Sequence, residues 1–390
     1  YNLFFKQKKK EDIVKAFNKS IKNFLIADKK VGLTLSAGID SNLIKIIMLK
    51  LKDKINSFTI GFKENSYDEA KFVKKNKYNL NKKKFLDERD FIKTFIKIKK
   101  NIYFPFGDSS IVPTYELFNL VKKKTNVVLG GDGGDEVFFG YLSFKAFYMT
   151  CFIKKIFPNF ILRMIKIPFR NIKITTEYLG VKKKIKYFFK FLNKELFMMN
   201  NYWISNFDNK DVAQYFKKKV YKSSFHIKKV KTLFNKNPNK MRFAQLFYIK
   251  YFLPMILMKV DYSSMLNSVE SRSPYLAKDL LNFSLNISTK KNFSVFKDRK
   301  LMNDIFSDYI KNYKKIRKHG FAFNKNIILK NEILIKRKID DNYLLNPFFF
   351  YDKYQNYLDG NYDYEQYLWN EIILNFSRQN LENTKNSNIT

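Results

Sequence analysis

The chain has 390 residues, of which 45% are hydrophobic and 18% aromatic, so it is long enough for two or three units with hydrophobic cores. Its formal charge is +40, from 75 lysines and arginines against 35 acidic residues. Such a charge would suit a polyanion, but Asn, Ile, Phe and Tyr are abundant too, which indicates drift toward AT-rich codons. We therefore do not expect nucleic acid to be a partner. The single cysteine, Cys151, excludes an internal disulfide and a multi-cysteine metal site.

No uncharged apolar run reaches the length of a membrane span; residues 251–258 form a typical example. No signal peptide pattern opens the printed sequence, so we expect a cytoplasmic protein without a membrane partner.

The first 140 residues alternate between predicted helices and strands. Apolar periodicity predicts helices over 10–26, 41–51, 68–78 and 88–102 and from Pro113, and strands over 31–36, 56–62, 83–86 and 126–129. This alternation predicts an α/β fold with a doubly wound parallel sheet. Ligands of such sheets bind beyond the carboxyl ends of the strands, where the turns 36–41 and 130–136 lie.

Strand signals fade after Tyr141. Residues 142–250 are typical of amphipathic helices rich in Lys and Phe, which we expect to pack inward as a helical lobe rather than lie on a membrane. We expect four consecutive segments: an α/β core over 1–141, a helical insertion over 142–250, a C-terminal helical part over 251–376 and a flexible tail over 377–390.

The first turn reads SAGIDS, residues 36–41. Small residues let the backbone approach an anion, and the following helix start offers free N–H groups. Asp40 would repel phosphates unless a cation lay between them, which suggests Mg²⁺. A plain strand-to-helix turn with Asp40 as a cap is the alternative that this stretch alone leaves open. No Walker A pattern occurs in the chain.

The second turn reads GGDGGDE, residues 130–136. Its acids, Asp132, Asp135 and Glu136, repel one another, and a metal or cationic ligand would relieve that repulsion. An acidic surface turn is the structural alternative. A third stretch, residues 259–276, carries Asp261, Glu270 and Arg272, which an ion-pair network would equally explain.

Together these stretches resemble the asparagine synthetase family of PP-loop ATP pyrophosphatases. The resemblance covers about residues 10–325. It rests on Ser36, Gly38, Asp40 and Ser41; on Gly131–Glu136, Phe138, Gly140 and Tyr141; on Lys259, Asp261, Ser264, Met265, Ser268, Glu270, Arg272 and Pro274–Leu276; and on the segments PFGDSS at 105–110 and KHGF at 318–321. The departures from the family pattern are Ala37, Phe104, Gly130, Phe139, Tyr262 and Ala277.

The resemblance implies a PP-loop fold of the adenine nucleotide alpha hydrolase type with a C-terminal, mostly helical lobe. It also implies that ATP adenylates the side-chain carboxylate of aspartate, and that ammonia converts the adenylate to asparagine, with AMP and pyrophosphate as the other products. ATP and Mg²⁺ are the implied cofactors.

The implied roles follow the matched positions. Asp40 and Asp135 would bind Mg²⁺, and Asp132 would assist ammonia attack. A cation among Lys297, Arg299 and Lys300 would stabilise phosphate charge. ATP would contact Leu35, Ser36, Ala37, Gly38, Asp40, Ser41, Ile60, Gly130 and Gly131. Substrate would contact Asp108, Ser109, Asp261, Glu270 and Arg272.

Two alternatives stay open at this point. Phe104, Tyr262 and Ala277 leave room for another carboxylate substrate such as a sugar acid, and the positive charge leaves room for an RNA-modifying PP-loop enzyme. Full family members hydrolyse glutamine with an N-terminal cysteine, whereas this chain has only Cys151. We therefore expect a glutaminase domain upstream of Tyr1 or on a separate protein. A homodimer is compatible with the sequence.

Overall fold

The computed structural model describes residues 10–64, 68, 70–73, 79–174, 180–207, 211, 214, 225–307, 324–331 and 347–387. The chain forms two compact units. The first comprises residues 1–87, 113–145 and 241–321, and the second comprises residues 88–112, 146–240 and 322–390. The units are therefore not the consecutive segments 1–141, 142–250 and 251–376 that we expected, because segments distant in the chain pack together.

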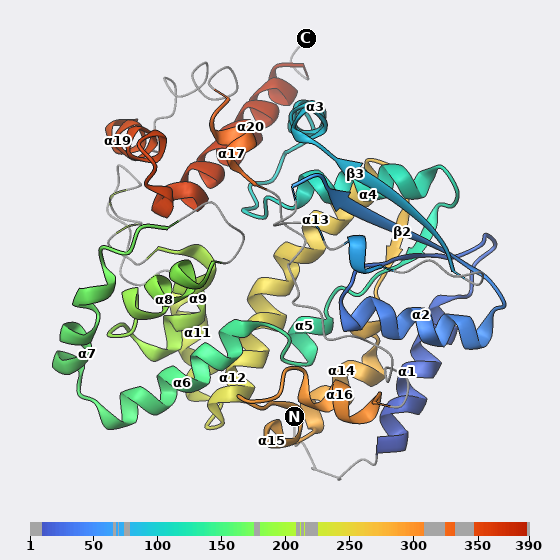
Figure 1. Cartoon of the computed structure of the whole chain (residues 1–390), viewed down its shortest axis with the longest axis horizontal. Coiled ribbons are helices and arrows are strands. Elements are labelled where there is room, and N and C mark those ends of the chain that lie inside the picture. The colour runs from blue at the N-terminus through green and yellow to red at the C-terminus, as the bar shows by residue number, and fades with distance from the viewer. Residues whose placement is uncertain are drawn as a thin grey trace. The chain divides into compact units, whose positions relative to one another are not determined.

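A five-stranded, fully parallel sheet forms the frame of the first unit (Figure 1). Its strands are β1 (Gly32–Thr34), β2 (Ile55–Phe62), β3 (Asn79–Leu86), β4 (Val127–Leu129) and β5 (Glu270–Arg272). Their order is β3-β2-β1-β4-β5. Leu33 of β1 pairs with Ser57 of β2 on one side and with Leu129 of β4 on the other. The strand order reverses between β1 and β4, and parallel sheets bind ligands at such a switch point.

Helices cover both faces of this sheet. One core joins β1 and β4 to helices α1 (Lys10–Phe24), α2 (Ile39–Leu51), α14 (Lys278–Asn286) and α16 (Lys300–Ile305), and it includes Leu33 and Leu129. A second core contains Val128 and residues of α4 (Ile111–Lys122). Neighbouring strand residues point to opposite faces, so Val128 and Leu129 place these cores on opposite sides of the sheet. The predicted doubly wound α/β fold is confirmed.

Strand β5 was not predicted, and the expectation that strands end before Tyr141 is wrong here. The strand has only three residues, all polar, so it lacks the apolar signature of a buried parallel strand. Its pairing comes from the sheet: Val127 pairs with Glu270 and Leu129 with Arg272.

The remaining described elements are predominantly helical. They are η1 (Ala70–Phe72), α3 (Glu88–Lys99), α5 (Gly134–Val137), α6 (Leu142–Ile156), α7 (Asn159–Ile165), η2 (Ile167–Phe169), α8 (Val181–Lys190), η3 (Leu196–Met198), α9 (Met199–Ser205), α11 (Phe225–Asn235), α12 (Lys240–Phe247), η4 (Tyr248–Phe252), α13 (Leu253–Met265), η5 (Pro274–Leu276), α15 (Thr289–Asn292), α17 (Asn326–Leu329), α19 (Pro347–Leu358), η7 (Tyr362–Tyr364) and α20 (Glu365–Ser387). Of the helix expected over 68–78, the described part contains the short turn η1, and residues 74–78 lie outside the described residues, as does the KHGF segment.

The expected flexible tail, 377–390, is helical as far as Ser387. Polar bonds within the second unit explain the difference. Ser377 Oγ donates to the carbonyl of Tyr103 at 2.9 Å, and Asn380 Nδ2 donates to the carbonyls of Lys99 and Ile102, each at 2.8 Å. These bonds satisfy carbonyls at the end of α3. They also hold the first residues of the segment 377–390, for which the polar composition alone predicts flexibility.

One described helical stretch, Lys240–Met265, is long and apolar enough to span a membrane by length and composition. Polar side chains of this stretch form hydrogen bonds within the first unit. Buried Gln245 donates to the carbonyl of Val137 and to Ser284 Oγ, both at 2.7 Å, and Arg242 donates to the carbonyl of Ser284 at 3.0 Å. These bonds mark the stretch as a core helix.

Candidate active site

The first turn joins β1 to α2 and is closed by its own side chains. Ser36 Oγ accepts from the N–H of Gly38 at 3.0 Å, and Ser41 Oγ accepts from the N–H of Ser36 at 3.1 Å. Asn42 Nδ2 bridges the carbonyls of Ser36 and Gly38 at 3.0 and 2.8 Å. Ala37 is buried and is not among the residues with positive φ, so its methyl group does not strain the backbone.

The second turn follows β4 and begins the short helix α5. Gly133 has φ 82°, a left-handed conformation that favours glycine, and a Cβ there would lie 2.3 Å from Leu276 Cδ2. The N–H of Gly130 donates to the carbonyl of Arg272 at 2.8 Å, which extends the β4–β5 ladder into the turn. The turn therefore leaves the sheet at the switch point, beside the first turn.

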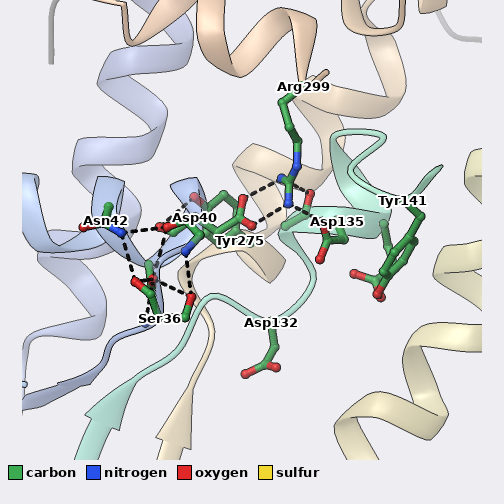
Figure 2. A network of polar contacts seen from close by, with 12 residues as sticks. Ser36, Asp40, Asn42, Asp132, Asp135, Tyr141, Tyr275 and Arg299 are labelled. Atoms are coloured by element: carbon green, nitrogen blue, oxygen red, sulfur yellow. Dashed lines mark hydrogen bonds and ion pairs between the residues drawn. The ribbon is translucent and has the colours of Figure 1, made fainter. Parts of the chain in front are cut away.

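The two turns meet at Arg299 (Figure 2). Arg299 Nη1 and Nη2 donate to Oδ1 and Oδ2 of Asp40, both at 2.5 Å, and Nη2 also donates to Asp135 Oδ1. Nη1 further donates to the carbonyl of Gly134 at 3.1 Å. The structure thus brings together the two predicted metal ligands and one of the three predicted cations.

This ion-pair cluster is largely removed from water. The side chains of Asp40 and Arg299 are each 7% exposed and that of Asp135 is 16% exposed. Burial alone would lower the pKa of Arg299, but the charges of Asp135 and Asp40 outweigh it and raise the pKa above its usual value. Arg299 is therefore a permanent cation in this position.

Glu136 has a different environment from its two acidic neighbours. It is 1% exposed and accepts a hydrogen bond from Tyr141 Oη at 2.6 Å. Burial raises the pKa of Glu136 to about 7; the charge of Asp135 adds to the rise, and the bond from Tyr141 opposes it. Burial also raises the pKa of Tyr141 well above its usual value, so this residue stays a hydrogen-bond donor.

The other predicted catalytic residues lie apart from the ion-pair cluster. Lys297 pairs with Asp304, and Lys300 Nζ donates to the carbonyl of Lys290 at 2.9 Å. Arg299 is thus the cation of the three that reaches Asp40 and Asp135. Asp132 accepts from Ser273 Oγ through its backbone carbonyl, and Figure 2 shows its carboxylate pointing away from Arg299.

The predicted nucleotide residues are at the expected strand ends. Leu35 is buried directly after β1 and Ile60 is buried within β2, two residues before that strand ends, and Thr59 Oγ1 donates to the carbonyl of Leu35 at 2.7 Å. Gly131 adjoins the first turn, because a Cβ there would lie 3.2 Å from Asp40 Cβ. Their contact with a nucleotide stays a prediction.

The predicted substrate residues of the first unit have structural contacts. Arg272 donates to Glu270 through Nε at 2.7 Å and through Nη2 at 3.3 Å, and Nη1 donates to the carbonyls of Phe24 and Ile26 at 3.0 and 2.7 Å. Arg272 therefore caps the end of α1 while paired with Glu270, and the contact of these two residues with substrate stays a prediction. Asp261 is exposed on α13.

Asp108 and Ser109 belong to the second unit. Asp108 Oδ1 accepts from the N–H of Ser110 at 2.9 Å and from Ser110 Oγ at 2.6 Å. This pattern satisfies free donors at the start of α4. Ser109 is 6% exposed beside it.

Sequence reasoning gave no role to Tyr275 and Gly140, although both belong to the matched motifs. Tyr275 is fully buried and its Oη donates to the carbonyl of Asp40 at 3.1 Å. A Cβ at Gly140 would lie 1.9 Å from Asp135 Oδ1 and 2.5 Å from Arg299 Cζ. Both residues shape the place where Arg299 meets the two acids, and their presence in the motifs was the available signal.

Asp40 and Asp135 fit a divalent cation shared with phosphate oxygens. Arg299 Nη2 bonds to an oxygen of each carboxylate, so one point in space is within reach of both. Mg²⁺ in nucleotide sites typically uses one or two carboxylates and completes its shell with phosphate oxygens and water. Among the described residues, no group of three or more His, Cys, Asp or Glu could hold a metal. The pair therefore fits Mg²⁺ together with ligands that a nucleotide would bring.

Comparison with known proteins gives this arrangement its family. The asparagine synthase family model matches residues 12–378. The chain belongs to the asparagine synthase family. A putative asparagine synthetase [glutamine-hydrolyzing] 2 of Methanocaldococcus jannaschii is 31% identical over 277 residues, 68% of this chain and 50% of that protein. Asparagine synthetase [glutamine-hydrolyzing] 1 of Bacillus subtilis is 25% identical over 345 residues, 83% of this chain and 51% of that protein. This member of the family therefore spans about half the length of these two curated relatives.

Proposed function

We propose that this chain is the synthetase part of an ATP-dependent amide ligase, and that aspartate is the carboxylate it activates. The observation that carries the proposal is the convergence of Asp40, after β1, and Asp135, after β4, on one cationic group at the switch point of a parallel sheet. Family membership supports the reaction type, and the names of the two relatives support aspartate and asparagine as substrate and product.

In this proposal the first reaction is adenylation. An oxygen of the aspartate side-chain carboxylate attacks the α-phosphorus of ATP, the bond from that phosphorus to the bridging oxygen breaks, and pyrophosphate leaves. Asp40 and Asp135 would hold Mg²⁺, which offsets the negative phosphate charge that would otherwise repel the carboxylate. The hydroxyls of Ser36 and Ser41 and the N–H of Gly38, which bond to one another within the turn, would donate to the leaving pyrophosphate once the turn opens.

The second reaction is amide formation. Ammonia attacks the acyl carbon of the adenylate and loses a proton, the bond from that carbon to the oxygen it shares with phosphorus breaks, and AMP leaves carrying that oxygen. Asp132 lies in the second turn with its carboxylate directed away from Arg299 (Figure 2), and in this proposal it accepts that proton or orients ammonia. Arg299 carries the charge that would stabilise departing phosphate groups.

Ammonia supply belongs to the proposal as well. Both relatives are named glutamine-hydrolyzing, and this chain spans about half of each. We propose that a glutaminase, either elsewhere in the same polypeptide or on another protein, delivers ammonia, and that free ammonium replaces it in a reaction mixture.

Isotope transfer tests the reaction. Aspartate labelled with ¹⁸O in the side-chain carboxylate is incubated with ATP, Mg²⁺, ammonium and the chain, and AMP is analysed by mass spectrometry. We expect one ¹⁸O in each AMP and an equal amount of asparagine, because the carboxylate oxygen remains on the phosphorus. The D135N variant, which removes one of the two acids, is expected to lose at least about 100-fold in rate.

Three outcomes decide between the candidates. Unlabelled AMP from a reaction that consumes aspartate would overturn adenylation. Absence of AMP with aspartate, combined with pyrophosphate release on addition of a sugar acid, would move the substrate to another carboxylate. Absence of pyrophosphate release with every carboxylate tried would overturn the ligase proposal.

A further inference from the structure

The guanidinium of Arg299 lies where the carboxylates of Asp40 and Asp135 converge. Its guanidinium binds Asp40 through two parallel hydrogen bonds of 2.5 Å and reaches Asp135 with the same Nη2 atom. A bidentate charge-assisted contact in a water-poor place is the strong form of an ion pair. The two acids therefore share one positive charge that the chain itself supplies.

The local backbone places the guanidinium of Arg299 between the two acids. Arg299 has φ 47° and ψ 46° as the residue before α16, a left-handed conformation that is unfavourable for a residue with a side chain. The missing side chain of Gly140 leaves the space that Asp135 and the guanidinium fill. The carbonyl of Gly134 accepts a further bond from Nη1. Such a strained and fitted arrangement indicates a defined seat for the guanidinium rather than one rotamer among many.

We infer that Arg299 is a resident counter-cation that keeps divalent metal out of the Asp40–Asp135 pair until a nucleotide binds. The inference rests on the proposed function, because ATP phosphates are the anions that would draw the guanidinium away from Asp135. Phosphate matches the geometry of a guanidinium as well as carboxylate does. The guanidinium can therefore exchange carboxylate oxygens for phosphate oxygens, and the two acids are then released for Mg²⁺.

The first turn is in a matching closed state. The N–H groups of Ser36 and Gly38 are bonded to the side chains of Ser41 and Ser36. The two N–H donors and the guanidinium of Arg299 are thus all bonded to groups of the chain itself before any phosphate binds. Because metal and nucleotide each favour the same opened state, each must raise the affinity for the other by the same factor.

Manganese binding without nucleotide tests the inference on the full chain. Mn²⁺ alone is the probe, and free Mn²⁺ is counted by electron paramagnetic resonance. The native chain is expected to bind Mn²⁺ weakly, whereas Arg299→Met is expected to bind one Mn²⁺ per chain at least about 10-fold more tightly, because the competing cation is gone. Adding D135N to this variant should abolish the gain. Lys19→Met is the matched control, because it removes the same charge from an exposed ion pair with Asp279, and it should bind Mn²⁺ as the native chain does.

Arg299→Lys covers the case in which Arg299→Met does not fold. A lysine ammonium cannot bond two carboxylates through a planar fork, so this variant should bind Mn²⁺ more tightly than the native chain. The inference is overturned if the native chain binds Mn²⁺ as tightly as the variants, or if the folded variants gain no site. These results are separate from the isotope experiment: a gain of the Mn²⁺ site without ¹⁸O transfer would keep Arg299 as the group that excludes metal and would count against adenylation of aspartate.

Discussion

At the scale of single residues, the candidate site is governed by charge in a place with little water. Asp40 and Asp135 each carry a negative charge near the other, and Arg299 is the group that makes this arrangement stable. Removing one partner of a buried ion pair leaves an uncompensated charge, which costs more than the intact pair contributes. The consequences differ according to which partner is removed.

Arg299→Met leaves both acids without this cation, whereas Asp40→Asn leaves Arg299 with Asp135. We expect the first change to lower the free energy of unfolding by about 3–5 kcal/mol and the second by about 1.5–3 kcal/mol, the range for hydrogen bonds to charged groups. Urea unfolding followed by circular dichroism measures both. Lys297→Met should change stability by less than about 1 kcal/mol, because its pair is exposed. Equal losses of unfolding free energy for all three variants would show that the ion pairs of Arg299 contribute no more to stability than the exposed pair of Lys297.

Cys151 allows a second measurement at the residue scale. Burial raises the pKa of its thiol to about 11, with Lys240 and Lys155 opposing the rise. The thiolate is the reactive form, so raising the pKa reduces reactivity at every pH below 11. At pH 8 we expect alkylation by iodoacetamide to be roughly 100-fold slower in the folded chain than in the chain unfolded in guanidinium. Equal rates in both states would contradict the burial of this thiol.

At the scale of elements, the site consists of two turns that follow neighbouring parallel strands. The sequence predicted both turns, because small residues after an apolar strand and before a helix form a local signal. The family resemblance implied that Asp40 and Asp135 would share Mg²⁺, which stays a prediction, and the structure places Arg299 between the two acids. The sequence could not show which of Lys297, Arg299 and Lys300 reaches the two acids. Arg299 reaches them because its backbone is left-handed and because Gly140 has no side chain to occupy the place of the guanidinium.

Other failures of prediction have the same origin in tertiary contacts. Strand β5 takes its conformation from pairing with β4, and its polar residues carry no strand signature. Glu270 and Arg272 belong to a matched motif, and the structure adds that Arg272 bonds to Glu270 and to carbonyls at the end of α1, while their contact with substrate stays a prediction. Charged residues in a motif therefore gave the right family without giving each residue's role.

The second turn offers a test at the element scale, with a control inside the chain. Gly133 and Gly360 both have positive φ, 82° and 90°. A Cβ at Gly133 would collide with Leu276, whereas at Gly360 it would meet nothing within 4 Å. Gly360→Ala should therefore lose about 1–2 kcal/mol from backbone strain alone.

Gly133→Ala should lose more than Gly360→Ala, because it adds a collision with Leu276 to the same strain. It should also weaken binding of ATP, because the turn that holds Asp135 must shift. Thermal unfolding and calorimetric titration with Mg-ATP measure the two effects. If the two variants lose the same stability and Gly133→Ala binds Mg-ATP as the native chain does, the contact of Gly133 with Leu276 affects neither stability nor nucleotide binding.

At the scale of the whole molecule, the positive charge has to be reconciled with the family. The chain carries +40 in formal charge, and two compact units share it. Such a charge attracts polyanions over a distance of about 10 Å at 0.1 M salt, whether or not a specific site exists. Binding of RNA would by itself therefore say little about function.

We expect the chain to bind tRNA and heparin equally at low salt, with a dissociation constant that rises steeply with salt and without preference among tRNA sequences. Counterion release predicts a linear dependence of the logarithm of affinity on the logarithm of salt concentration. Filter binding from 50 to 200 mM KCl measures the slope. The decisive part is the reaction: AMP formation with aspartate and ammonium should be the same with and without tRNA, and heparin is the control for a general polyanion effect. AMP formation that needs tRNA and is not supported by heparin would instead favour an RNA-modifying enzyme, because a non-specific charge cannot distinguish two polyanions in this way.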